Sequence, residues 1–208
     1  MTDSHQHPRH VLIQMTKDTF IKRIEQYVQL TDEEMRYAKS VLEPSLIRQN
    51  DLLVANGEPC KFMIYVCAGC LMSYYTDSSG NVHVIQFATE GWWTGDLHSF
   101  TNYTPSIYST KALADSEVLL ITKPDLDDLF NKVPKFERYF RIIFQNSLVT
   151  HQFRIIQNFS STAEERYLYF QNKYSSLEQF VPLKYIASYL GITPEFLSKV
   201  RRKIMEKS

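Results

Sequence analysis

The sequence has few of the features that catalysis, secretion or membrane insertion requires. No apolar run approaches the roughly 20 residues of a membrane-spanning helix. Residues 1–10 are polar and lack the apolar core of a secretory signal. No glycine-rich phosphate loop, nucleophile elbow or zinc-protease motif occurs. We therefore expect a cytoplasmic protein that is not an enzyme and has no membrane partner.

Cysteine is scarce, with three residues in a chain of 208. The odd number does not suggest a disulfide framework. Cys67 and Cys70 have the spacing of a redox or metal-binding pair, but the only other cysteine is Cys60. Small half-buried thiols are common in strands, so we favour a structural role. The histidine-rich residues 1–17 are typical of a mobile tail, and we expect no metal site and no cofactor.

Positive charge is concentrated at the C-terminus, although the 23 Lys and Arg residues balance the 23 Asp and Glu residues. Residues 183–208 hold six cations and two carboxylates, a net charge of +4, which leaves −4 for the rest. A basic end on an acidic body is typical of a segment that binds phosphates. A solvated last helix with cations near its negative dipole end is the other interpretation.

The N-terminal part alternates between helical and strand patterns. Residues Asp18–Val28 have helical spacing, and Thr31 with Glu34 fits a capping box for a second helix to about Leu42, ended by Pro44. From Leu46 to Thr122, short β-branched and aromatic runs alternate with turns such as Asn56-Gly57. The clearest predicted strands are Phe62–Val66, Leu71–Tyr75, Val82–Phe87, Thr110–Ala114 and Val118–Thr122. This pattern predicts an antiparallel β-roll of the jelly-roll or double-stranded β-helix type, and an α+β fold overall.

A long helix is predicted from about Lys135 to Asn158, after Pro134. A helix of about 24 residues spans roughly 36 Å, more than a small domain needs. A dimer interface explains this length, and a single helix that covers the roll explains it as well. The predicted stripe consists of Phe136, Phe140, Ile143, Ser147 and Thr150.

The C-terminal segment has the pattern of a helix-turn-helix. Thr162 precedes a helix from Ala163 to about Tyr174, and the later helices follow Pro182. Gly191 suits the turn between them, because glycine accepts positive φ without steric cost. Thr193 suits the N-cap of the last helix. The inward apolar set is Ile186, Leu190, Ile192, Leu197 and Val200.

The second helix of this motif is expected to enter the major groove of double-stranded DNA. The residues expected to face base edges, together with the cap, are Thr193, Pro194, Glu195, Ser198, Lys199 and Arg202. Arg201 and Lys203 are expected to contact phosphates. An ordinary helical hairpin is the structural alternative. The corresponding functional alternative is a ligand-binding or protein-interaction module whose C-terminal helices only pack.

From about Asp18 onward, the sequence resembles the Crp/Fnr family of bacterial transcription regulators. The matching features are Asn56–Glu58, Gly95–Leu97, Asp115–Val118, Ala163–Tyr167 and Ile186–Arg202. The resemblance implies a cyclic-nucleotide-binding-type β-roll, a dimerisation helix and a C-terminal DNA-binding domain in a homodimer. It also adds RNA polymerase and an unidentified small-molecule effector as candidate partners. The expected divisions are residues 1–17, 18–132, 133–159 and 160–208.

Two departures from the family pattern concern ligand and DNA. Cyclic-nucleotide-binding members carry Gly-Glu-Leu and an Arg that neutralises the cyclic phosphate. Here Asp96 replaces the Glu, Ser106 falls at the Arg position, and no Arg occurs between Arg48 and Arg138. We therefore expect no tight binding of cAMP or cGMP. The chain also ends six residues after Arg202, so we expect no β-hairpin wing.

The former nucleotide cassette is unusually aromatic. Two interpretations are open: a pocket for a flat or apolar ligand, or aromatic side chains that fill the space of a nucleotide or form core. We favour the second. The candidate pocket residues are Trp92, Trp93, Asp96, Leu97, Ser106 and Tyr108.

Overall fold

The computed structural model describes residues 17–175, 177–179 and 181–206. The chain forms two compact units. The first unit comprises Met1–Ser73 and Phe87–Ile143, and the second comprises Tyr74–Gln86 and Phe144–Ser208. The end of β4 (Cys70–Thr76) and the first part of β5 (Val82–Thr89) therefore belong to the same unit as the C-terminal helices. Residues 1–16 of the predicted tail lie outside the described residues.

The strands form two four-stranded sheets, and antiparallel pairs occur in both. One sheet has the order β1 (Glu43–Ile47), β8 (Ser116–Thr122), β3 (Phe62–Ala68) and β6 (Trp93–Thr94). The other has the order β2 (Leu52–Val54), β7 (Ser109–Ala112), β4 (Cys70–Thr76) and β5 (Val82–Thr89). The α+β fold with an antiparallel roll is confirmed.

The sequence pattern did not identify β1. Pro44 was expected to end a helix, but it lies inside β1, at the edge of its sheet, where a missing N–H is tolerated. The helix α2 (Asp32–Ser40) ends before the expected Leu42 because β1 begins at Glu43. Its capping box is present, with the Thr31 hydroxyl and the Glu34 carboxylate each accepting from the other residue's N–H.

The other helices of the first unit flank the sheets. Residues 17–24 are helical, and α3 (Leu97–Asn102) and α4 (Lys123–Lys132) follow along the chain. The helix α5 (Lys135–Ser160) begins in this unit. Its first turns bury Phe136, Tyr139 and Phe140. The beginning of α5 therefore covers the first unit, as one of the two interpretations of this helix expected.

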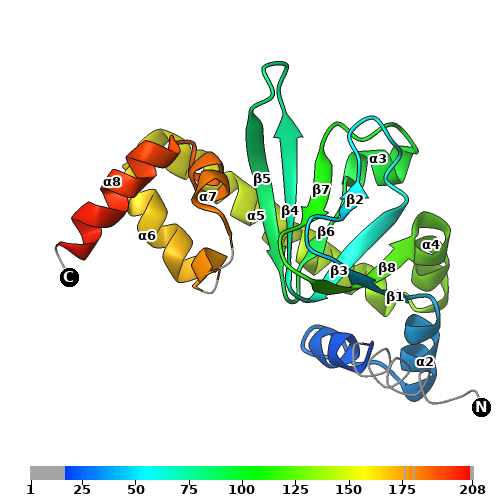
Figure 1. The fold of residues 1–208 in the computed structure, drawn as a ribbon. Helices are drawn as coiled ribbons and strands as arrows, with labels where there is room; N and C mark the ends of the chain where they lie inside the picture. Colours follow the sequence, from blue (N-terminus) through cyan, green and yellow to red (C-terminus); the bar gives the residue numbers. More distant parts are fainter. Residues whose placement is uncertain (1–16, 176, 180, 207–208) are drawn as a thin grey trace, which may run out of the picture. The chain divides into compact units, whose positions relative to one another are not determined.

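The second unit is a small helical domain joined by the ends of β4 and β5. It contains the rest of α5, then α6 (Ala163–Lys173), a 3-10 helix (Leu177–Gln179), α7 (Leu183–Leu190) and α8 (Pro194–Met205). In Figure 1, α6, α7 and α8 lie together, and contacts join α8 to both of the others. The buried core includes Tyr167, Phe170, Leu177, Ile186, Ala187 and Leu197. None of the helices among the described residues has the length and hydrophobicity that crossing a membrane requires.

Candidate nucleic-acid interface

The turn between α7 and α8 has the geometry that a helix-turn-helix needs. Gly191 ends α7 in the left-handed region with φ 68° and ψ 35°, which a residue with a Cβ adopts only at a cost. The N–H of Ile192 then donates to the carbonyl of Ala187 at 3.0 Å. Thr193 caps α8, and its hydroxyl accepts from the N–H of Phe196 at 3.2 Å. Ala187 is fully buried, so a small residue stands where the helices approach.

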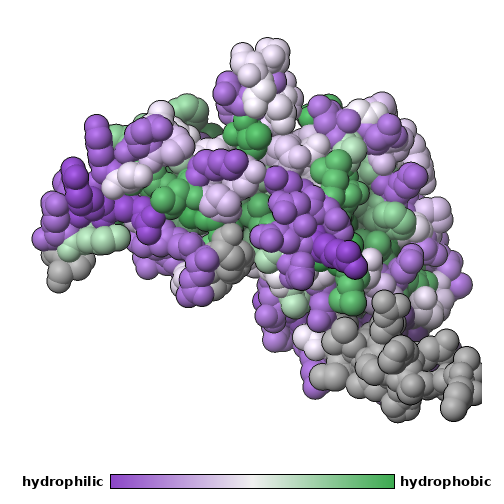
Figure 2. Space-filling model, viewed as in Figure 1, coloured by the Kyte–Doolittle hydropathy of each residue, from purple (hydrophilic) through white to green (hydrophobic). Residues whose placement is uncertain are grey.

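The side chains expected to meet DNA lie mostly on the exposed face of α8. Solvent-exposed members of the predicted set are Thr193, Pro194, Glu195, Ser198, Lys199, Arg202 and Lys203. Leu197 and Val200 are buried on the opposite face. Strongly hydrophilic side chains cover much of α8 in Figure 2. One helix therefore presents a polar face to solvent while its apolar face fixes it to the unit.

Hydrogen bonds in the first turn of α8 favour the ionised form of Glu195. Hydrogen bonds from its own N–H and from Thr193 lower the pKa of Glu195. A carboxylate in that state can only accept hydrogen bonds. Further along the helix, Lys203 Nζ pairs with Glu164 at 2.7 Å, and Arg202 lies 3.9 Å from Glu206. These exposed ion pairs are weak enough to be exchanged for phosphate contacts.

Arg201, which is predicted to contact phosphates, is less exposed than the other members of the predicted set. It is half-buried, and its Nε is buried without an acceptor among the described residues. Its guanidinium acts on Tyr167, whose pKa rises to about 12 chiefly through burial, with Glu178 adding to the rise and Arg201 opposing it. Position 201 is one turn after the buried Leu197, so helical spacing turns Arg201 toward the protein.

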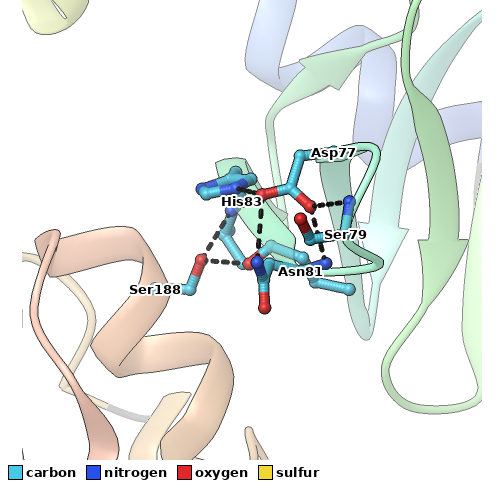
Figure 3. A network of polar contacts seen from close by, with 7 residues as sticks. Asp77, Ser79, Asn81, His83 and Ser188 are labelled. Atoms are coloured by element: carbon cyan, nitrogen blue, oxygen red, sulfur yellow. Dashed lines mark hydrogen bonds and ion pairs between the residues drawn. The ribbon is translucent and has the colours of Figure 1, made fainter.

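A contact that the sequence did not predict joins α7 to β5 within the second unit. The Ser188 hydroxyl donates to the carbonyl of Val82 at 2.7 Å and accepts from the N–H of Val84 at 2.9 Å (Figure 3). Because β5 is the last strand of its sheet, these groups have no neighbouring strand to pair with. One side chain of the helix-turn-helix therefore satisfies both a donor and an acceptor of the strand edge.

The turn that leads into β5 is closed by Asp77. Its carboxylate accepts from the N–H groups of Ser79 and Asn81, each at 2.9 Å, and lies 2.8 Å from His83 Nε2 (Figure 3). The contact with His83 is the largest cause that lowers the pKa of Asp77 well below its usual range, and the Asn81 bonds add to it. The predicted turn at Ser78–Asn81 is therefore stabilised by one carboxylate.

Replacing Ser188 with alanine is expected to destabilise the second unit. The substitution leaves a part-buried carbonyl and N–H unpaired, which costs about 1–3 kcal/mol. Urea unfolding monitored by circular dichroism measures the loss. Ser160→Ala is the matched control, because its exposed hydroxyl bonds only to the carbonyl of Ile156 in its own helix. Equal stability of the two variants would contradict the role of Ser188.

In the first unit, polar groups of the former nucleotide cassette bond to one another. The Ser106 hydroxyl donates to the Asp96 carboxylate at 2.7 Å, and that carboxylate also accepts from the N–H of Ser99 at 3.0 Å. The Tyr108 hydroxyl donates to the carbonyl of Gly95 at 2.9 Å. Asp96 and Ser106 are buried. The residues at the family's Glu and Arg positions thus form an internal hydrogen bond.

The aromatic residues of the cassette divide into core and surface. Trp93 is buried, with edge contacts to Phe20 and Tyr65, and its indole N–H donates to the Tyr139 hydroxyl at 3.0 Å. Trp92 is half-buried, and Leu97 is exposed. The six candidate pocket residues therefore do not share one surface: Asp96, Ser106 and Tyr108 make a polar cluster, while Trp93 belongs to the aromatic core.

The cysteines are free thiols among the described residues. Burial raises the pKa of both Cys67 and Cys70 to about 12, and Glu117 and Glu90 add to the effect at Cys67. Burial also raises the pKa of Cys60. Thiols in this state are poor nucleophiles and poor metal ligands at neutral pH. This supports the structural interpretation of the pair.

Comparisons with known proteins agree with this architecture. The cyclic nucleotide-binding domain family matches residues 45–133. An anaerobic regulatory protein from Pasteurella multocida is 23% identical over 189 residues, which cover 85% of this chain and 68% of the relative. A fumarate and nitrate reduction regulatory protein from Vibrio cholerae is 25% identical over 185 residues, 82% of this chain and 72% of the relative. These matches support a transcription regulator of the Crp/Fnr type.

Solved structures share the fold over most of the chain. The structure of FixK2 from Bradyrhizobium japonicum superposes with a TM-score of 0.69 at 18% identity, and covers 80% of this chain and 86% of that one. The Crp/Fnr resemblance predicted from sequence is confirmed, whereas the individual roles of residues on α8 and in the cassette remain predictions.

Proposed function

We propose that this Crp/Fnr regulator acts as a homodimer that reads a two-fold symmetric DNA site with α8. The observation that carries the proposal is the polar, exposed face of α8 behind the Gly191 turn, opposite a buried face that packs on α6 and α7. A helix presented in this way can enter the major groove. The +4 charge of residues 183–208 favours the approach to phosphates.

The side chains on this face differ in charge, and we expect them to contact different groups of the DNA. Glu195, in the first turn, can accept from cytosine N4, and Lys199, one turn later, can donate to guanine O6 and N7. Ser198 lies between them and can bond either kind of base edge. Arg202 continues this face, and Lys203 lies toward its flank, where backbone phosphates are expected.

The second half of α5 supports the homodimer. Its large apolar side chains are solvent-exposed in the single chain: Leu148, Val149, Phe153, Ile155, Ile156 and Phe159. Six such residues on one helix form an unusual apolar surface. We infer that a second copy of the same helix, related by a two-fold axis, covers this apolar surface. The second copy also supplies a second α8 for a palindromic site.

In this proposal, residues 18–132 form the sensor, 133–159 the dimerisation helix and 160–208 the DNA-binding domain. An unidentified small-molecule effector and RNA polymerase are its further partners. Three elements, β4, β5 and α5, continue from one compact unit into the other. An effector that favours one arrangement of the sensor would act on DNA binding through these continuous elements.

Selection of binding sites from random DNA by the purified protein tests the function. We expect a pseudo-palindromic motif whose half-site centres are about 34 Å, one helical turn, apart. The complexes are expected to weaken steeply as salt rises. Failure to enrich any motif, together with weak retention on heparin, would favour the alternative of a ligand-binding or protein-interaction module.

Titration of cAMP or cGMP is expected to give no saturable heat at micromolar concentrations. A cyclic phosphate in the cassette would lack an Arg partner, because Ser106 stands at that position and is already bonded to Asp96. Isothermal calorimetry makes the measurement. Micromolar or tighter binding of either nucleotide would overturn this expectation and require another cation in the cassette.

A further inference from the structure

A small cavity of about 20 Å³ lies inside the second unit, between α5, α6 and the end of α7. The charged side chains that line it are all positive. Three cations contribute to it: Arg154 from α5, and Arg166 and Lys173 from α6. No Asp or Glu is among the described residues that line it, whereas the amides of Gln157 and Asn158 are. Aromatic and aliphatic side chains complete the lining, so the cavity combines an apolar wall with hydrogen-bond donors and positive charge.

The two guanidinium groups are held in place by main-chain oxygens. Arg154 donates to the carbonyls of Val84 at 2.9 Å, Tyr189 at 3.0 Å, and Ile85, and it lies over the Tyr189 ring at 4.1 Å. Arg166 donates to the carbonyls of Leu190 at 3.1 Å and Ser161 at 2.7 Å. These bonds fix the orientation of both groups but supply no compensating negative charge.

One strong donor remains without an acceptor. Arg154 Nε is buried and finds no hydrogen-bond partner among the described residues. A buried guanidinium N–H left in this state is costly. Desolvation lowers the pKa of Lys173, and the neighbouring charge of Arg154 lowers it further, so these two cations repel each other. An anion between them would remove both costs.

We propose that this cavity binds a small monovalent anion of the size of chloride. The cavity holds about one water-sized group, which excludes larger organic anions. Its donors suit an anion better than a water molecule, because a water would satisfy Arg154 Nε but would not reduce the repulsion between the cations. The site goes beyond DNA recognition and does not depend on the function proposed above.

The bound anion would stabilise the junction at which Arg154 ties the β5 edge to α5 and α7. Thermal unfolding of the full-length protein, without DNA, tests this at constant ionic strength while chloride replaces gluconate. We expect a saturable rise in Tm with chloride concentration, because a ligand that binds only the folded state stabilises by mass action. Bromide is expected to act in the same way.

Two lysine variants separate site binding from general salt effects. Lys173→Met removes one cation of the cavity and is expected to lose the saturable rise. Lys184→Met is the matched control, because Lys184 is exposed on α7 and outside the cavity, and it should keep the rise. If all three proteins respond alike to chloride, the proposal is overturned.

Crystals soaked in bromide provide a direct readout that does not rely on the stability of a variant. We expect an anomalous peak within hydrogen-bond distance of Arg154 Nε. Bromide peaks that occur only on the outer surface, with a water molecule in the cavity, would overturn the proposal even if Tm rises with chloride.

Discussion

Replacing both Ile155 and Ile156 with glutamate is expected to convert the protein to a monomer. Its binding to a palindromic site is expected to weaken by about 100-fold or more, because the linkage between half-sites is lost. The two side chains are 55% and 57% exposed, so the single chain tolerates the change. In the dimer, four carboxylates would meet across the two-fold axis without compensating charge. Sedimentation equilibrium measures the mass, and fluorescence anisotropy measures the DNA affinity.

The double variant Ile155→Leu and Ile156→Leu is the control, since it keeps the apolar volume and is expected to remain a dimer with nearly unchanged affinity. A glutamate variant that remains dimeric at micromolar concentration would place the interface elsewhere. A monomer that still binds the full site as tightly as the unmodified protein would show that two linked half-sites are not needed.

The helix caps were predictable because their causes are local. Thr31, Thr162 and Thr193 each precede a helix, and each hydroxyl accepts from an N–H three residues later in the structure. Gly191 was predictable for the same reason. The turn after α7 has a positive φ, which favours glycine whatever the helices pack against.

Contacts between distant segments were not predictable from these patterns. Ser188 bonds to residues more than 100 positions away, and no local pattern marks it as the partner of a strand edge. No sequence pattern singles out Arg154 either, yet its guanidinium donates to three main-chain carbonyls. The roles of these two side chains follow only from the folded structure, in which β5 lies beside α7.

The long helix was predicted from Lys135 onward, but the stripe predicted for it contains none of the apolar residues that are exposed in its second half. The predicted stripe included Phe136 and Phe140, which are buried in the first unit, and continued to positions beyond Ile143. An apolar stripe reports that something covers it but not what. The structure separates the two cases by exposure, because the apolar residues from Leu148 onward remain open to solvent.

Arg201 was assigned to phosphates because of its charge, although its spacing pointed inward. It follows the buried Leu197 by four residues, which places both on the same side of α8. Its long side chain then lies against Tyr167, inside the unit. When an arginine lies at the border of an apolar helix face, its position in the helical repeat therefore predicts its surroundings better than its charge does.

Lys199→Ala is expected to lower the affinity for the specific site by about 1–3 kcal/mol per subunit and to relax the preference at one base pair in each half-site. Lys199 is exposed one turn after Glu195, on the face opposite Leu197. Glu195→Ala is expected to lose less affinity but to broaden specificity, because an anion near DNA acts mainly by rejecting wrong bases. Binding to site variants at two salt concentrations measures each effect.

Lys203→Ala is the matched comparison, because Lys203 is an exposed lysine on the same helix whose partner is Glu164 and whose expected DNA contact is a phosphate. It should weaken all sequences about equally and reduce the salt slope by roughly one per subunit. Arg201→Ala should instead lower stability, since it vacates a half-buried position. If Lys199→Ala and Lys203→Ala give the same sequence-independent loss, α8 does not lie in the groove with this face toward the bases. A rotation of α8 about its axis would then bring Lys203 toward the base edges, and its exposed ion pair with Glu164 would have to break on binding.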